Sequence, residues 1–359
     1  TELRRGSAAW LHLHVRVRHQ SRGLIAMGEG RGPVGESMRR LVIALRDALG
    51  PVVTAALEDG HVVEVMLNPD GKLFVERIGQ GIEEVGRITP QEAEIVIGKV
   101  AHALRSEVDW DRPIISGELP LGGHRFEGIL PPAASGPMFT IRKRASMLIQ
   151  LDQYVSDGIM LPTHLDAIRE AIANRHNIIV SGGTGSGKTT LTNAIIAELD
   201  GISPGHRLVI LEDTAEIQCA GRNHVMLHTT DHVDMDRLLK STMRLRPDRI
   251  IVGEVRDGAA LTLLKAWNTG HPGGICTVHA NSAVAALTRL EQLVAEVSIQ
   301  PMPEVIGEAV DLIVSIERAP QGRVVREILR VEGFRAGAYQ ISSIGNRNSD
   351  SMQGKLHVA

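Results

Sequence analysis

The chain has 359 residues, of which 43% are hydrophobic and 23% are charged. This composition predicts a globular protein of two or three domains and excludes a mainly disordered chain, which would bury too little apolar surface to offset its ordering entropy. No apolar run approaches the roughly 18–20 residues that span a bilayer, and the formal net charge of −3 argues against nonspecific nucleic-acid binding by the whole surface.

Residues 1–34 are predicted to form a flexible basic tail. They carry six arginines and two glutamates, and they end in a glycine-rich stretch. His12, His14 and His19 raise the option of a metal site, but no thiol or carboxylate set completes the ligands. The simpler interpretation is a set of scattered imidazoles.

Residues 35–145 predict a small α+β domain. The apolar spacing over 37–49 is helical, and apolar runs on both sides of a Pro-Asp-Gly turn predict a β-hairpin over 62–75. Thr89, followed by proline and by Glu92, has the pattern of a helix start with a capping box. Short strands separated by glycine and proline complete the domain.

A linker is predicted at 146–161, a second domain at 162–333 and a polar C-terminal tail at 334–359. In the second domain, short apolar strands alternate with amphipathic helices. The expected strands are 178–180, 207–211, 250–252 and 275–278, and the expected helices are 162–172, 188–199, 234–244, 257–267 and 283–297. This alternation predicts an α/β fold with a mostly parallel sheet, covered by helices on both faces.

The most specific motif is a glycine-rich loop between an expected strand and an expected helix. Residues 182–189 match the phosphate-binding pattern G-x-x-x-x-G-K-[ST]. Glycines let successive N–H groups point at a phosphate, and the helix N-terminus adds partial positive charge. Lys188 is expected to reach the β- and γ-phosphates, and the Thr189 hydroxyl to ligate Mg²⁺. The predicted nucleotide-binding residues are Gly182, Gly183, Thr184, Gly185, Ser186, Gly187, Lys188, Thr189 and Thr190.

The predicted nucleotide is ATP, with Mg²⁺. The sequences Asn-Lys-x-Asp and Thr-Lys-x-Asp, one of which guanine-reading GTPases normally need, do not occur in this chain.

Two expected strands end in acidic residues. Glu212 and Asp213 follow one strand, and Glu254 follows another. Ligands of parallel sheets lie at the carboxyl ends of the strands, so these acids are expected near the phosphates, one on the metal and one on the attacking water. The alternative for either strand is a helix cap or a salt bridge.

His279 ends a further strand and is a candidate sensor of the γ-phosphate, and His271 precedes the same strand. For both, a hydrogen-bonded structural histidine is the alternative.

A hydrolase also needs a cation that neutralises charge in the transition state, and a neighbouring subunit can supply it. The candidates are Arg142, Arg144, Arg244, Arg246 and Arg256. For any one of them, a surface ion pair is the simpler interpretation.

Four segments now stand in a defined order: the glycine-rich loop, residues 211–216, residues 245–256 and residues 270–281. In this order they resemble the traffic ATPases of type II and type IV secretion and conjugation, where they are called Walker A, Asp box, Walker B and His box. The resemblance covers roughly residues 50–320. Within the family, residues 66–71, 141–145 and 266–271 look most like the Trb-type ATPases of conjugative transfer.

The resemblance implies a homohexameric ring with a RecA-like ATPase domain and ATP at the junction of the two domains. It implies that Glu212 is the general base and that Glu254 acts on Mg²⁺ or its waters, although these two roles could be exchanged. It also implies that His279 senses the γ-phosphate and that Arg142 lies near the nucleotide. Thr189 and Glu254 are the expected metal contacts.

The implied function is a motor that couples Mg-ATP hydrolysis to domain motions, driving pilus assembly or export of DNA or protein. The implied partners are inner-membrane components of the channel, without direct sequence-specific recognition of nucleic acid. The implied location is cytoplasmic, peripheral to the inner membrane. The absence of a four-cysteine module favours conjugation over type II secretion or type IV pilus assembly. A RecA-like DNA translocase and a non-hydrolysing scaffold remain alternatives.

Overall fold

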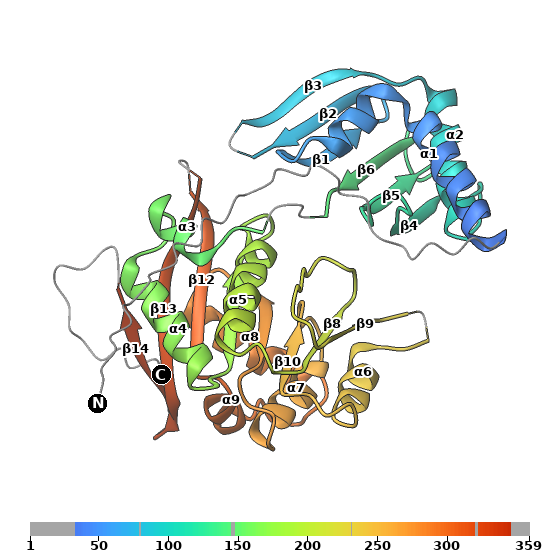
Figure 1. Ribbon diagram of the computed structural model, residues 1–359. Coiled ribbons are helices and arrows are strands. Elements are labelled where there is room, and N and C mark those ends of the chain that lie inside the picture. The colour runs from blue at the N-terminus through green and yellow to red at the C-terminus, as the bar shows by residue number, and fades with distance from the viewer. Residues whose placement is uncertain (1–32, 79, 145–147, 231, 320–321, 346–359) are drawn as a thin grey trace, which may run out of the picture.

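The computed structural model describes residues 33–78, 80–144, 148–230, 232–319 and 322–345. They form two domains, an N-terminal one and a larger second one (Figure 1). The tail predicted at 1–34, with its three histidines, lies outside the described residues except for the first two residues of helix α1.

The N-terminal domain is one antiparallel sheet with two helices. Its sheet has the order β3-β2-β1-β6-β5-β4. The elements are α1 (Pro33–Glu58), β1 (Val62–Leu67), β2 (Lys72–Arg77), β3 (Gly81–Arg87), α2 (Pro90–Ala103), β4 (Ile114–Glu118), β5 (Arg125–Ile129) and β6 (Met138–Arg142). The predicted hairpin is β1–β2, and Gly71 in its turn has a φ of +81°. Both hydrogen bonds of the predicted capping box between Thr89 and Glu92 are present.

The helix expected at 37–49 is part of α1, which continues beyond it through a kink at Gly50 and Pro51. The fully buried side chains of Leu45 on α1 and Val96 on α2 meet Phe139 of the sheet in the core of this domain.

The second domain carries an eight-stranded sheet of order β14-β13-β12-β7-β11-β10-β8-β9. Its elements are α3 (Leu151–Ser156), α4 (Pro162–Ala173), β7 (Ile178–Gly182), α5 (Lys188–Ile202), β8 (Leu208–Glu212), β9 (His224–His228), α6 (Met235–Thr242), β10 (Arg249–Val252), α7 (Ala259–Asn268), β11 (Ile275–His279), α8 (Ala283–Ala295), α9 (Pro303–Ala309), β12 (Leu312–Ala319), β13 (Gly322–Arg335) and β14 (Ala338–Ile344). Pairing is parallel from β12 to β9 and antiparallel between β12, β13 and β14. The predicted α/β fold with a mostly parallel sheet is confirmed.

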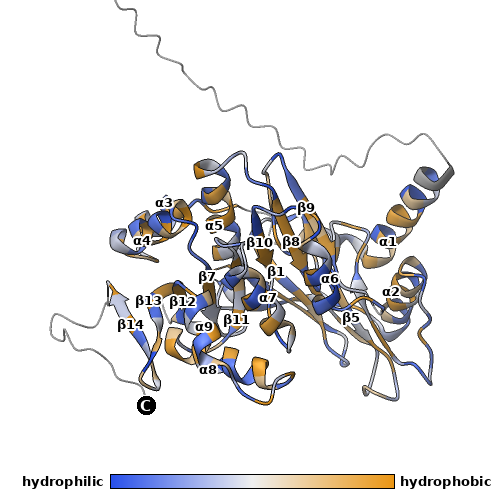
Figure 2. Ribbon diagram, turned by 90° about the horizontal axis from the view of Figure 1, so that it is seen from below, coloured by the Kyte–Doolittle hydropathy of each residue, from blue (hydrophilic) through white to orange (hydrophobic). Residues whose placement is uncertain are grey.

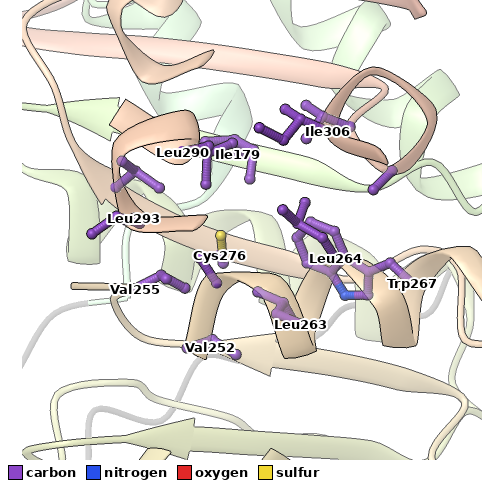
Figure 3. Close-up of a cluster of buried hydrophobic side chains, with 14 of the residues drawn as sticks. Ile179, Val252, Val255, Leu263, Leu264, Trp267, Cys276, Leu290, Leu293 and Ile306 are labelled. Atoms are coloured by element: carbon purple, nitrogen blue, oxygen red, sulfur yellow. The ribbon is translucent and has the colours of Figure 1, made fainter. Parts of the chain in front are cut away.

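Helices cover both faces of this sheet. Helices α3, α4 and α5 bury one face, and α6, α7, α8 and α9 bury the other. Figure 3 shows Leu264 of α7 and Leu290 of α8 in one cluster with Cys276 of β11. The parallel strands β8 and β10 are hydrophobic along most of their length, as parallel strands covered on both faces must be (Figure 2).

The structure differs from the sequence prediction at both ends of the second domain. The linker expected at 146–161 contains helix α3, whose Leu151 and Tyr154 are buried against α4 and α5. The tail expected at 334–359 begins with the end of β13 and with β14, which pairs antiparallel with it. β14 carries Gln340, Ser342 and Ser343, and its sequence has no continuous apolar run, so this edge strand resembles a solvated tail in sequence. Residues 346–359 lie outside the described residues.

None of the helices in the described ranges is both long enough and apolar enough to cross a membrane.

The α7–α8 face is expected to dominate the stability of the second domain. Leu264→Ala removes a side chain that is 1% exposed, and we expect a loss of about 2–5 kcal/mol because a cavity remains. Ile299→Ala changes a fully exposed side chain and should stay within about 0.5 kcal/mol of the parent protein. Urea unfolding followed by circular dichroism measures both, and equal midpoints would contradict the expectation.

Candidate active site

The glycine-rich loop joins β7 to α5 at the carboxyl edge of the parallel sheet. β7 ends at Gly182, and α5 begins at Lys188 after Gly187 as its N-cap. Gly187 has a φ of +97°, and no side chain in the described chain caps the helix there. The N–H groups of the first turn of α5 are therefore available to an anion, as the motif predicted.

Two of these positions require glycine. A Cβ on Gly182 would stand 2.3 Å from the carbonyl oxygen of Ile316 and 2.5 Å from Oγ of Ser186. At Gly187 the positive φ is strained for any L side chain, and a Cβ would meet Arg323 at 3.1 Å. The loop can therefore follow this path against Ile316, Ser186 and Arg323 only if both residues lack a side chain.

Lys188 lies inside this cradle. Its Nζ donates hydrogen bonds to the carbonyl oxygens of Gly182 (2.8 Å) and Gly183 (3.0 Å). Burial lowers the pKa of the ammonium group, with partial compensation from the charge of Glu254. Ser186, beside it, is buried, and its hydroxyl has no partner among the described residues. Phosphate oxygens would satisfy both groups.

Thr189 faces a carboxylate that the sequence reasoning did not single out. Its hydroxyl donates a hydrogen bond of 3.1 Å to Oε2 of Glu216. Glu216 lies in residues 213–217, here called the Asp-box loop, which follows β8. The signal that could have identified it was present, because Glu216 ends the acidic segment 211–216 that carried the family resemblance.

Glu212 closes the base of the Asp-box loop. Its side chain is 3% exposed, and Oε1 accepts the N–H groups of Glu216 (3.0 Å) and Ile217 (2.7 Å). Oε2 has no hydrogen-bond partner in the described chain, and Nε2 of His228 lies 4.0 Å away. Burial raises the pKa of this carboxyl to about 7 despite those two N–H groups. Its role as general base stays a prediction, and its observed contacts are those of a residue that holds the loop.

Glu254 follows β10 and is more open than Glu212. Its Oε2 accepts a hydrogen bond of 2.7 Å from Nε of Arg256, whose guanidinium also lies 3.6 Å from Asp213. The hydroxyl of Thr277 donates to the carbonyl oxygen of Gly253 at 2.6 Å and so attaches this strand end to β11. Arg256 is therefore part of an ion-pair cluster within the chain.

The two candidate histidines lie at opposite ends of strand β11. His279 is exposed at the carboxyl end of β11 and pairs in register with Gly182, so it stands at the phosphate-binding edge as predicted. It also lines a cavity of about 340 Å³ with Asn281 and Arg289. His271 precedes β11 and therefore lies at the amino edge, away from the glycine-rich loop. The structure does not support a nucleotide contact by His271.

The candidate arginines are also separated. Arg142 is exposed on β6 and pairs with Glu64 of the same sheet at 3.4 Å, and its place near the nucleotide stays a prediction. Arg144 reaches the Asp-box loop instead, and its Nη2 donates to the carbonyl oxygen of Ile217 at 3.0 Å. Arg244 and Arg246 precede β10 and lie at its amino end.

The family described as Type II/IV secretion system protein matches residues 125–333 of this chain. The chain belongs to that family. Conjugal transfer protein TrbB of Rhizobium radiobacter is 66% identical to it over 320 residues, which are 89% of this chain and 98% of the relative. Type IV secretion system protein VirB11 of Bartonella quintana is 30% identical over 286 residues, covering 68% of this chain and 79% of the relative.

Among solved structures, the ATPase DotB of Legionella pneumophila matches with a TM-score of 0.58 at 22% identity, covering 76% of this chain and 78% of that one. At this identity the likeness concerns the fold alone. The resemblance to secretion and conjugation ATPases, inferred from four motifs, and to the Trb type, inferred from residues 66–71, 141–145 and 266–271, is confirmed by the two sequence relatives and the family match.

The buried carboxyl of Glu212 should make stability depend on pH. Because its pKa is about 7 in the folded protein and ordinarily 4.5, the folded state holds a proton that the unfolded chain releases, and stability falls as the pH rises between these values. Glu212→Gln keeps an acceptor without the charge. We expect this variant to be more stable than the parent by about 3 kcal/mol at pH 8 and by less than about 1 kcal/mol at pH 5.

Unfolding by urea at several pH values checks this expectation, with the exposed Glu308→Gln as the control. A stability difference between Glu212→Gln and the parent that does not change with pH would contradict the raised pKa.

Proposed function

We propose that this chain is the ATP-hydrolysing motor of a type IV secretion or conjugative transfer system. Hydrolysis of Mg-ATP would drive motions of the two domains that assemble a pilus or export DNA or protein. The single observation that carries the proposal is the glycine cradle around Lys188, with Thr189 and Glu216 in contact beside it. The relatives named for conjugal transfer and type IV secretion support the choice of system.

The proposed roles follow from the contacts. Lys188, now bonded to two carbonyl oxygens, would transfer its hydrogen bonds to the β- and γ-phosphates. The hydroxyl of Thr189 and the carboxylate of Glu216 are hard oxygen ligands of the kind that Mg²⁺ prefers, directly or through water. Bound there, Mg²⁺ would supply charge neutralisation on the phosphates.

The sequence left open which of Glu212 and Glu254 acts on the attacking water, and the two side chains differ in solvent exposure. The side chain of Glu254 is 22% exposed and that of Glu212 is 3% exposed. A residue that orients the attacking water must reach it, so we assign this role to Glu254 and the loop-holding role to Glu212. His279, at the same sheet edge, would contact the γ-phosphate.

We further propose a homohexamer that docks on inner-membrane components of the channel, at the cytoplasmic side of the membrane. Arg256 is paired within the chain, and Arg142 pairs with Glu64. Because both arginines have partners within the chain, an arginine from a neighbouring subunit would supply the remaining positive charge that stabilises the transition state. Sequence-specific binding of nucleic acid is not part of the proposal.

Removing the lysine should abolish turnover. We expect Lys188→Ala to lower phosphate release from Mg-ATP by about 10²-fold or more, because the transition-state charge loses its nearest cation. Lys240→Ala removes an exposed lysine on α6 that pairs with Asp236, and it should keep the parent rate. Both variants should show the parent circular dichroism spectrum. Parent-like phosphate release by Lys188→Ala would refute the assignment of the glycine-rich loop.

An active site shared between subunits should make the specific activity depend on protein concentration. We expect phosphate release per subunit to rise with concentration and then level as rings close. Mass measured on the same samples by light scattering identifies the assembly. An active monomer would eliminate the ring while leaving the ATPase assignment intact.

A further inference from the structure

The Asp-box loop is held from two sides. From its own domain, Glu212 accepts the N–H groups of Glu216 and Ile217, and the hydroxyl of Thr229 donates to Asp213 at 3.1 Å. The opposite side of the loop faces the N-terminal domain. Figure 1 shows the connection after β8 rising from the second domain toward β4 and β5.

Three side chains from the other side contact this loop, two from strands β4 and β5 of the N-terminal domain and one that follows β6. Oε1 of Glu118 accepts the N–H of Ala215 at 2.8 Å, Arg125 donates to the hydroxyl of Thr214, and Arg144 donates to the carbonyl oxygen of Ile217 at 3.0 Å. The N-terminal domain contacts Thr214 and Ala215, the second domain contacts Asp213 and Glu216, and Ile217 is contacted from both. One of the three partners is an acid and two are arginines.

Glu118 and Arg125 bind the Asp-box loop together. Glu118 ends β4, Arg125 begins β5, and the two residues are opposite each other in the antiparallel register. The same end of this hairpin therefore offers an acceptor to the backbone of the loop and a donor to its side chain. A hydrogen bond from an N–H group to a carboxylate is stronger than one between neutral groups.

The backbone around Glu216 is fixed by both domains together. Three successive N–H groups, those of residues 215, 216 and 217, are accepted by two carboxylates, one from each domain. The side chain of Glu216 leaves this fixed backbone toward Thr189. Loss of the contact at Ala215 would free the peptide next to Glu216 and change the direction of its carboxylate.

From this geometry we propose that Glu118, supported by Arg125 and Arg144, is a positioning residue for catalysis: the N-terminal domain sets the orientation of Glu216 in the same chain. The inference rests on the proposed ATPase function. Movement of the N-terminal domain would then change the catalytic rate directly, because that domain holds the Asp-box loop and the loop carries Glu216 of the active site.

The test compares Glu118→Ala, which removes the acceptor, with Glu118→Gln, which retains one. Glu127→Ala is the matched control, since Glu127 is an exposed acid on the same hairpin. We expect Glu118→Ala to lower kcat by about 10-fold with KM for ATP within twofold of the parent, because a misdirected catalytic group affects the transition state more than ground-state binding. Glu118→Gln should recover most of the loss, and Glu127→Ala should keep the parent rate.

Hydrogen exchange supplies a readout that does not need activity. In Glu118→Ala, amides of residues 213–217 should exchange faster than in the parent, and in Glu127→Ala they should not. The proposal is overturned by an unchanged kcat in Glu118→Ala, by an increase in KM alone, or by unchanged exchange of the loop. If the parent chain releases no phosphate, the proposed function fails, and loop exchange alone decides whether Glu118 holds the loop.

Discussion

The carboxylate of Glu212 is the contact on which the geometry of the candidate site depends. It lies at the end of a buried strand, where an ionised group is unfavourable unless hydrogen bonds replace its water. Oε1 obtains two such bonds from the backbone of residues 216 and 217, whereas Oε2 has none in the described chain. The loop is therefore folded over the carboxylate, and this fold directs Glu216 to Thr189.

The parallel sheet brings the other parts of the site to the same edge. Strands β7, β8, β10 and β11 run in the same direction, so the residues that follow them meet although they are far apart in the sequence. His279 lies opposite Gly182 in the register, and the β8–β10 pairing places Glu212 and Glu254 at neighbouring strand ends. Strand β12, which is parallel to β7, and the β13–β14 pair extend the sheet beyond β7 and keep that strand in its interior.

The N-terminal domain contributes contacts to the Asp-box loop that no motif in its sequence predicts. Its residues Glu118 and Arg125 form an ordinary antiparallel pair at a strand end, and only their position against the Asp-box loop gives them significance. Arg144 shows the same principle. It is the last described residue before the connection between the domains, and it reaches the loop, whereas Arg142 pairs within its own sheet. Two arginines that are two residues apart in the chain thus have partners in different domains.

The sequence by itself determined the local parts: the strand–loop–helix around Lys188, the capping box at Thr89, the mostly parallel sheet and membership of the secretion family. These depend on residues close together in the chain, or on several motifs in a recognisable order. Only the tertiary structure decided that Glu216 contacts Thr189, that Glu212 is buried, and that His271 lies at the end of the sheet away from the glycine-rich loop. The reason is physical, because burial, register and the docking of one domain on another arise from contacts between segments that are distant in sequence.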